Sequence, residues 1–388
     1  MGEATPVRSV YVHAPFCVRR CVYCDFAVTV DPRGDARGWL DALSRELELV
    51  EREGLLALDA RLETLYVGGG TPSLLGPDAM AGLAARFGGE RLSAPDLEWT
   101  AEANPESFTP ELARAWRRAG VNRVSLGVQS FHEPTLRWMG RLHGPEGAER
   151  AVRTARAAGF TNVSVDLIFG LPPRLERSWE DDLERALALD VPHVSLYGLS
   201  VEPSTPLGRA VAAGRERLDE ERYREDYLVA CERLAAAGYR HYEVSNFARE
   251  GCASRHNAAY WDGRPYLGLG NGAHSYAHPV RRWNVRDWAA YRERLARGAS
   301  PEEGRETLSD EARALERVWL GLRTDAGLPW DELGETARAL VRGWQARGLA
   351  VRAPDRVRLT PLGWLELDRL AVELDGAQAA PAGADRSR

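Results

Sequence analysis

Three cysteines stand close together in the stretch "YVHAPFCVRRCVYCDF", Tyr11–Phe26, with the spacing C-x3-C-x2-C. The stretch overlaps an apolar run, "SVYVHA" at 9–14, that predicts a β-strand, so the cysteines fall in the loop that follows it. A structural zinc site commonly takes four ligands as two separated pairs, and no fourth cysteine lies nearby. Thiolates suit iron–sulfur clusters, and three of them on a four-iron cluster would leave one iron open. The spacing therefore favours such a cluster over zinc.

The composition is that of an ordinary globular protein: 388 residues, 44% hydrophobic and 28% charged, with a net charge of −6. The length allows one large domain and a smaller one. The negative charge argues against a nucleic-acid binder, whose surface is usually basic. We expect a cytoplasmic protein, because the sequence has no apolar run of about 18 residues and no signal-peptide pattern. All 51 basic residues are arginine, which excludes a lysine Schiff base and a Walker A loop.

Strand-like and helix-like segments alternate through the first half of the chain. The helical segments show a period of about 3.6 residues, and several end in Ala-Gly, which is typical of a left-handed helix cap. Such alternation predicts βα units and a parallel sheet, here an α/β fold with a partial (β/α)6 TIM-like barrel; an open doubly wound sheet is the alternative. The six predicted strands, and a possible seventh, are 9–14, 62–68, 97–102, 123–128, 162–170, 193–200 and 240–248.

Polar and glycine residues follow or close these strands. In a βα barrel the site forms at the carboxyl ends of the strands, so these residues should meet on one face. An iron left open by three cysteines can be chelated by the amino group and carboxylate of S-adenosylmethionine, a cofactor that carries radical chemistry. The strand-end residues are the glycine-rich 68–73, Glu102, Gln129, Arg141, Asp166 and Ser200.

The second half of the chain is less regular. We expect the barrel to occupy 1–240 and a connecting segment rich in glycine and aromatic residues to occupy 241–300. The stretch "ARGASPEEGRE" at 296–306 is interpreted as a linker. A mostly helical accessory domain follows at 301–375; it ends in a predicted hairpin and helix that resemble a winged helix. A disordered tail is expected at 376–388.

Several motifs together carry a resemblance to a known family. "CVRRCVYC" resembles the signature of the radical S-adenosylmethionine superfamily. The wider set resembles the HemW haem chaperones, which are relatives of oxygen-independent coproporphyrinogen III oxidase (HemN). The resemblance spans 10–370 and implies a partial (β/α)6 barrel with a C-terminal accessory domain. The further motifs are "YVGGGTPS", "EANPES", "SLGVQSF", "GRLHG", "VDLIFGLP", "HYEVSNFA" and "RHNAAYW".

The resemblance also implies roles for individual residues, although it assigns no catalytic residue. The ligands of a [4Fe-4S] cluster would be Cys17, Cys21 and Cys24. Contacts to S-adenosylmethionine would come from Tyr11, Tyr23, Gly69, Gly70, Thr71, Glu102, Gln129, Arg141, Asp166 and Ser200, of which the last four match a second such site in the oxidase. Haem would be bound by His256, Asn257, Tyr260 and Trp261, since imidazole is a common haem ligand and aromatic rings can cover a porphyrin. Cys252 is a second candidate for the haem ligand.

Three function classes stay open at this stage. The first is a haem chaperone that binds haem, a cluster and S-adenosylmethionine and delivers haem to apo-haemoproteins such as respiratory enzymes. The second is the oxidase, against which two features argue. The oxidase pattern has a further cysteine where this chain has Phe26, and an N-terminal extension where this chain has sixteen residues before Cys17. The third is an iron–sulfur redox sensor that binds DNA through the winged-helix-like end, against which the net charge argues.

For the chaperone class the resemblance implies the following partners. Haem is the cargo, and apo-haemoproteins are the recipients. Radical chemistry would require an electron donor such as flavodoxin or ferredoxin. A homodimer is one possible assembly, and the protein would be cytoplasmic, with peripheral contact to a membrane during haem delivery as one option. No nucleic acid is expected.

Overall fold

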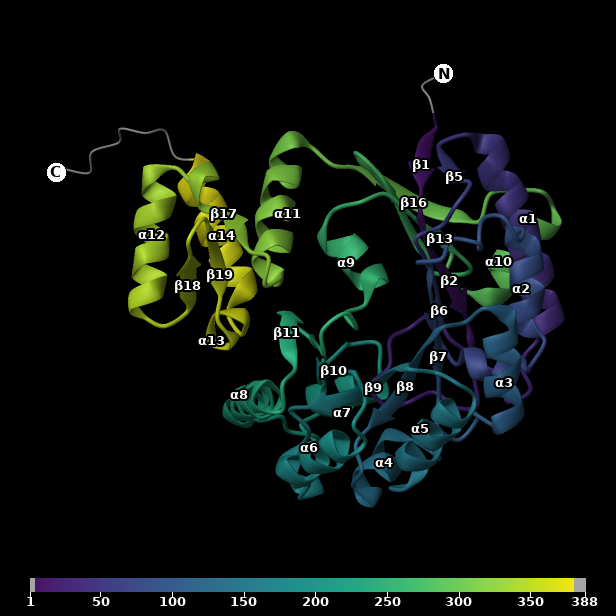
Figure 1. Cartoon of the computed structure of the whole chain (residues 1–388), viewed down its shortest axis with the longest axis horizontal. Coiled ribbons are helices and arrows are strands. Elements are labelled where there is room, and N and C mark those ends of the chain that lie inside the picture. Colours follow the sequence, from purple (N-terminus) through teal and green to yellow (C-terminus); the bar gives the residue numbers. More distant parts are fainter. Residues whose placement is uncertain (1–3, 380–388) are drawn as a thin grey trace.

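A computed structural model describes residues 4–379, and its centre is a 12-stranded sheet. Six neighbouring strands of this sheet are parallel, and each predicted strand is present within two residues of its expected bounds. Figure 1 shows the sheet curving while helices cover its outer side. The predicted partial (β/α)6 barrel is thus confirmed. Its strands are β2 (Ser9–Ala14), β6 (Thr64–Gly69), β7 (Glu98–Ala103), β8 (Arg123–Gln129), β9 (Asn162–Phe169) and β10 (His193–Gly198).

The helices of the barrel begin and end at residue types that favour helix termini. Thr109 accepts a hydrogen bond from Leu112 N (3.2 Å) at the start of α3, Pro110 occupies the first turn, and Gly120 ends the helix at φ 112°. Most buried side chains of the helices and strands join in one hydrophobic core, and a smaller cluster contains Met139, Ile168 and Leu207. The barrel helices are α1 (Ala36–Glu53), α2 (Ala79–Phe87), α3 (Pro110–Ala119), α4 (Glu133–Met139), α5 (Gly147–Ala157), α6 (Trp179–Ala188), α7 (Pro206–Ala212) and α8 (Glu220–Ala236).

The possible seventh strand is instead a hairpin. Val244 and Ser245 form a turn that divides 240–248 into β11 (Arg240–Glu243) and β12 (Asn246–Ala248). β12 pairs antiparallel with β10, so the parallel series stops there. The prediction of one strand was wrong because the apolar alternation continues through the turn without a glycine or proline to mark it.

At the other edge the sheet continues beyond β2. β13 (Tyr266–Leu269) pairs parallel with β2, and the antiparallel strands β14 (His274–Ala277), β15 (Val280–Asn284) and β16 (Glu302–Thr307) follow. The interpretation of 296–306 as a linker was therefore wrong for its second half, which is β16. Its charged sequence "EEGRET" is that of an exposed edge strand, and such charges hide the strand pattern. The helices α9 (Arg255–Trp261) and α10 (Trp288–Ala296) flank this extension.

The C-terminal region is a small unit of helices around a three-stranded antiparallel sheet, in the order β17-β19-β18. This confirms the predicted helical, winged-helix-like end. The tail prediction was wrong at 376–379, which continue helix α14; residues 380–388 lie outside the described residues. The elements are α11 (Asp310–Arg323), β17 (Leu328–Pro329), α12 (Glu335–Ala346), β18 (Ala350–Ala353), β19 (Arg356–Leu359), α13 (Pro361–Trp364) and α14 (Leu367–Ala379).

Two short strand pairs complete the fold. One joins β1 (Thr5–Val7) to β5 (Leu56–Leu58) beside the start of the barrel. The other joins β3 (Phe16–Cys17) to β4 (Thr29–Val30) and holds the two ends of the cysteine loop together. Within residues 4–379 no helix is both long and apolar enough to cross a bilayer.

Candidate functional site

The three cysteines of the N-terminal loop line one cavity of about 370 Å³ at the carboxyl ends of the barrel strands. All three thiols are free and half-buried. The sulfurs do not converge on the position of a single metal ion, and no other group of His, Cys, Asp and Glu in residues 4–379 does so. A four-iron cluster does not require that convergence, because each thiolate binds a different iron. The donor set thus fits such a cluster, with one iron left without a cysteine.

The thiols of Cys17 and Cys24 are protonated in the protein without metal. Burial raises the pKa of Cys17 to about 11, although Thr71 Oγ1, 3.5 Å from its sulfur, acts in the opposite direction. Burial also raises the pKa of Cys24. Because iron binds the thiolate, cluster assembly must release these protons.

The glycine-rich loop after β6 packs against the backbone that carries the cysteines. Gly70 N donates to Ala14 O (2.8 Å), and Thr71 N donates to Phe16 O (2.8 Å). A Cβ on Gly70 would lie 2.6 Å from Ala14 O and 2.8 Å from Phe16 O. Glycine is therefore needed here for the approach of two backbone segments, and the loop lines the cavity with Gly69, Gly70 and Thr71.

Glu102, at the end of β7, is a strand-end carboxylate held in place by two donors. Tyr66 OH donates to its Oε1 (2.7 Å), and Gly69 N donates to its Oε2 (3.0 Å). Burial raises the pKa of Glu102 to about 7, while the bond from Tyr66 opposes this change. The carboxylate lines the cavity and can accept a cationic or hydroxyl group of a ligand.

Gln129 and Arg141 bring unpaired polar atoms to the same cavity. Gln129 sits at a bulge between β8 and β9 with φ 70°, a conformation that is costly for a residue other than glycine. Its Oε1 is buried without a partner in the described residues, as is Arg141 Nε. Arg141 Nη2 donates to Asn104 Oδ1 (2.7 Å) and to Gly127 O. Unpaired buried donors and acceptors beside a cavity fit a polar, zwitterionic ligand such as S-adenosylmethionine.

Of the remaining predicted site residues, some line the cysteine cavity and one does not. Asp166 lines the cavity and accepts from Ser125 Oγ (3.0 Å), and burial raises its pKa. Tyr23 and Ser200 also line it. Tyr11 lies outside, where its hydroxyl is bonded to His13 Nδ1 (2.9 Å). Four polar lining residues carry no role in the predicted site, and two of them stand in the motif "EANPES". They are Arg19, Asn104, Glu106 and Tyr197.

The "HNAAYW" segment lies in helix α9, and none of its residues lines the cysteine cavity. His256 is buried, and both of its ring nitrogens are bonded: Nδ1 to Thr64 Oγ1 and Nε2 to Tyr260 OH, each at 2.8 Å. Its ring stacks on that of Tyr66 with 5.0 Å between centroids. Burial lowers the pKa of His256 to about 3, so the ring is neutral. In this structure neither nitrogen of His256 is free to bind iron.

The other end of the same helix faces a cavity. Trp261 lines a space of about 490 Å³ between the sheet extension and the C-terminal region. Arg323 lies over its indole at 4.3 Å. Asn257 and Cys252 line neither this cavity nor the cysteine cavity.

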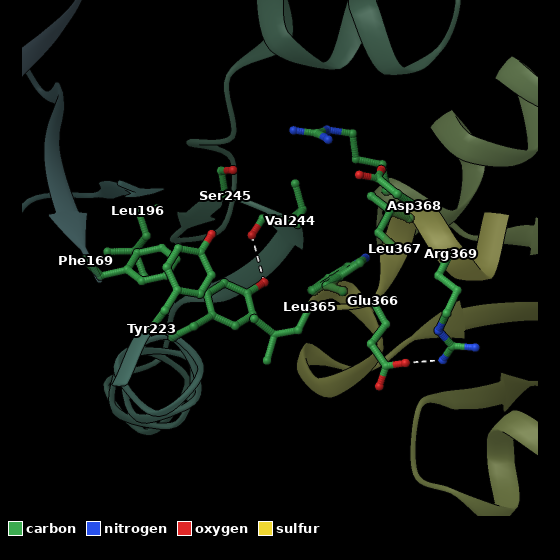
Figure 2. Close-up of a pocket in the computed structure, with 14 residues that line it drawn as sticks. Phe169, Leu196, Tyr223, Val244, Ser245, Leu365, Glu366, Leu367, Asp368 and Arg369 are labelled. Atoms are coloured by element: carbon green, nitrogen blue, oxygen red, sulfur yellow. Dashed lines mark hydrogen bonds and ion pairs between the residues drawn. The ribbon is translucent and has the colours of Figure 1, made fainter. Parts of the chain in front are cut away.

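A third cavity, of about 580 Å³, lies between the barrel and the C-terminal region. Figure 2 shows the ring of Tyr223 beside Phe169 on the barrel side, opposite the 365–369 segment. Tyr223 can lie across the ends of β9 and β10 because Gly170 and Gly198 have no side chains; a Cβ there would meet its ring or hydroxyl at 2.4 and 2.0 Å. Gly198 also lines the cysteine cavity, so the two cavities adjoin.

Comparisons with known proteins agree with this architecture. The family described as the radical SAM superfamily matches residues 11–186, and the HemN C-terminal domain matches 308–365. The chain is 41% identical over 372 residues to "Heme chaperone HemW" of Mycobacterium tuberculosis, covering 95% of this chain and 94% of that protein. It is 35% identical to "Heme chaperone HemW" of Bacillus subtilis, covering 83% and 85%. The solved coproporphyrinogen III oxidase (HemN) from Escherichia coli superposes with a TM-score of 0.78 at 23% identity, covering 96% of this chain and 90% of that one.

Fold and site together define a radical SAM protein, with a partial barrel whose open end holds the cysteine loop. Within that superfamily, the chain belongs to the HemW heme chaperone family, because its likeness to the curated members extends over nearly the whole length of both chains.

Proposed function

We propose that this protein is a haem carrier: it binds haem, a [4Fe-4S] cluster and S-adenosylmethionine, and it delivers haem to apo-haemoproteins, among them respiratory enzymes. The observation that carries the proposal is the full-length likeness to proteins named heme chaperones. The site supports it, because three thiols and several unpaired polar atoms share one cavity.

Separate residues would serve the cluster and its ligand. Cys17, Cys21 and Cys24 would hold three irons, and a bound cluster would supply one open iron for a chelating ligand. Arg141 would face the carboxylate of S-adenosylmethionine, and Glu102 would accept from its ammonium or ribose hydroxyl groups. Haem transfer itself needs no radical, so an electron donor such as flavodoxin or ferredoxin is required only where the cluster is to be reduced. Homodimer formation belongs to the same proposal.

The experiment that tests the proposal is haem transfer. The chain is reconstituted anaerobically with iron and sulfide, loaded with hemin and freed of excess, and then mixed with the apo form of a b-type haemoprotein. We expect the absorption spectrum of the recipient's holo form to develop at the expense of the carrier's spectrum. A chain that takes up no hemin, or that retains it in the presence of the recipient, would contradict the proposal.

The second candidate function is oxidative decarboxylation of coproporphyrinogen, which the superposition on HemN brings into consideration. Phe26, 62% exposed at the rim of the cavity, stands where the oxidase pattern has a cysteine. We therefore expect the reconstituted, reduced protein with S-adenosylmethionine to form no protoporphyrinogen from coproporphyrinogen. Product analysis by chromatography checks this, and product formed at enzymatic turnover would establish the oxidase instead.

A further inference from the structure

We propose that haem binds in the cavity between the sheet extension and the C-terminal region, with His278 as the iron ligand. This inference rests on the proposed function, because it names the place of the cargo. It moves the ligand from His256, whose two nitrogens are bonded inside the protein, to a histidine at the surface of a cavity.

The cavity has the size and the aromatic wall that a porphyrin needs. Its volume of about 490 Å³ lies within the usual range of cofactor sites. Trp261 and Tyr276 both line it. Two further rings connect Trp261 to Tyr276. The ring centroid of Tyr260 lies 6.4 Å from that of Trp261 and 4.6 Å from that of Tyr266, and the centroids of Tyr266 and Tyr276 are 6.3 Å apart. Of the motif "HNAAYW", Trp261 thus belongs to the wall of this cavity, whereas His256 and Tyr260 do not line it.

His278 is the metal-binding side chain that the cavity offers. It is exposed, it lines the cavity, and its Nδ1 lies 3.5 Å from Tyr276 OH. Within the described residues its Nε2 has no hydrogen-bond partner, and that nitrogen is therefore free to bind iron. Among residues 4–379, the rest of the lining contains no other His, Cys or Met. The cavity in Figure 2 is larger, but none of these three residue types from the described part of the chain lines it.

Two arginines of the cavity can meet the propionates of haem, because neither has a carboxylate partner among the described residues. Arg317 forms no side-chain hydrogen bond or ion pair among residues 4–379, and Arg356 donates only to the backbone oxygens of Ala326 and Gly327. Three lining acids already have arginine partners, whereas Glu332 has none in the described part of the chain. Those three pairs are Asp310 with Arg313 (2.8 Å), Glu316 with Arg281, and Asp262 with Arg264 (3.4 Å).

Hemin titration of the full, cluster-reconstituted chain tests the ligand. In His278→Ala we expect the absorption band of the imidazole-bound iron to shift and hemin to bind about tenfold more weakly, as expected for the loss of one strong contact. Added free imidazole should restore the band, which a merely structural role of His278 would not allow. His256→Gln should keep the wild-type band.

The propionate contacts are tested with a second probe. Arg317→Gln should weaken hemin binding about tenfold and leave the binding of hemin dimethyl ester unchanged, because the ester has no carboxylates. Arg342→Gln is the matched control, since Arg342 is an exposed arginine of the same region that pairs with Glu335 (3.1 Å) outside the cavity. Leu365→Trp, which fills the cavity of Figure 2, should also leave hemin binding unchanged.

The outcomes separate the two proposals. If the wild-type chain takes up no hemin, the proposed function fails. If it takes up hemin, and His278→Ala keeps the spectrum while His256→Gln loses it, the helix histidine is the ligand and this inference is overturned. Equal binding of hemin and its ester by the wild-type chain would likewise overturn the assignment of Arg317.

Discussion

At the scale of single residues, the three loop cysteines differ from the other two in where they lie. Cys17, Cys21 and Cys24 share a cavity, while Cys231 is 5% exposed on α8 and its thiol pKa is raised by burial to about 12. A buried thiol of that kind packs as a small apolar side chain rather than acting as a metal ligand.

We predict that alanine at any of the three loop positions abolishes the cluster, because each thiolate binds its own iron. Anaerobic reconstitution followed by iron and sulfide analysis should give close to four of each per wild-type chain and almost none per variant. Cys231→Ala is the control and should retain the cluster. Retention of the full cluster by Cys21→Ala would contradict the assignment.

We predict that Glu102→Gln weakens S-adenosylmethionine binding about tenfold while the iron content stays unchanged. The amide keeps the shape of the side chain but loses the charge and one of the two acceptor oxygens. Equilibrium dialysis of the reconstituted protein measures the change. Glu98→Gln is the matched control, because Glu98 lies on the same strand but bonds the start of α9 and does not line the cavity. A loss of affinity as large in this control would argue against a direct contact.

At the scale of elements, α1 is fastened to the sheet extension through one buried carboxylate. Glu46 is 3% exposed and accepts from Gly270 N (2.8 Å), Asn284 Nδ2 (2.5 Å) and Tyr291 OH (2.5 Å). Burial raises the pKa of Glu46 to about 7, and the three donors oppose that change without cancelling it. The contact keeps β13–β15 and α10 against α1, and so supports the edge of the barrel where the cysteine loop begins.

This pKa predicts a dependence of stability on pH. Between about 4.5, the ordinary value, and about 7 the folded chain keeps a proton on Glu46 that the unfolded chain has lost. The free energy of unfolding therefore falls as pH rises through that window, by up to about 3 kcal/mol from this group. Urea unfolding at pH 5 and pH 7.5 measures it. In Glu46→Gln the free energy of unfolding should decrease between pH 5 and pH 7.5 by about 3 kcal/mol less than in the wild-type chain. The same decrease in both proteins would contradict the prediction.

At the scale of the whole molecule, the C-terminal region is joined to the barrel by aromatic and cationic contacts. Trp364 is 6% exposed, and its Nε1 donates to Leu322 O (2.8 Å). The ring centroids of Trp364 and His241 are 4.2 Å apart. Arg323 lies between the indoles of Trp261 and Trp319, at 4.3 and 5.0 Å, with Glu243 Oε2 3.8 Å from its Nε. Figure 1 shows α11 between the sheet extension and the rest of this region. We propose that the two units divide near residue 308, where the HemN C-terminal match begins.

We predict that Trp364→Ala lowers the free energy of unfolding by about 3–5 kcal/mol, because a large buried side chain leaves a cavity at the junction. Urea unfolding measures this, and limited proteolysis should cut faster near residue 308. Val351→Ala, at a 49% exposed position of the same region, is the control and should change stability by less than about 0.5 kcal/mol. A similar, small effect in both variants would show that Trp364 is not important to the junction.

The sequence by itself determined the barrel and the set of residues at its open end. Strand periods and helix-ending glycines are local signals, and the carboxyl ends of parallel strands must meet on one side. For this reason the sequence alone predicts that Cys17, Glu102 and Asp166 lie together. The tertiary structure alone decided what depends on contacts between distant segments. It paired "EEGRET" with β15, divided 240–248 into a hairpin against β10, and bonded both nitrogens of His256 to Thr64 and Tyr260. The sequence around a histidine does not show which distant residues contact it. Whether its ring nitrogens are free to bind a metal can therefore be determined only from the folded structure.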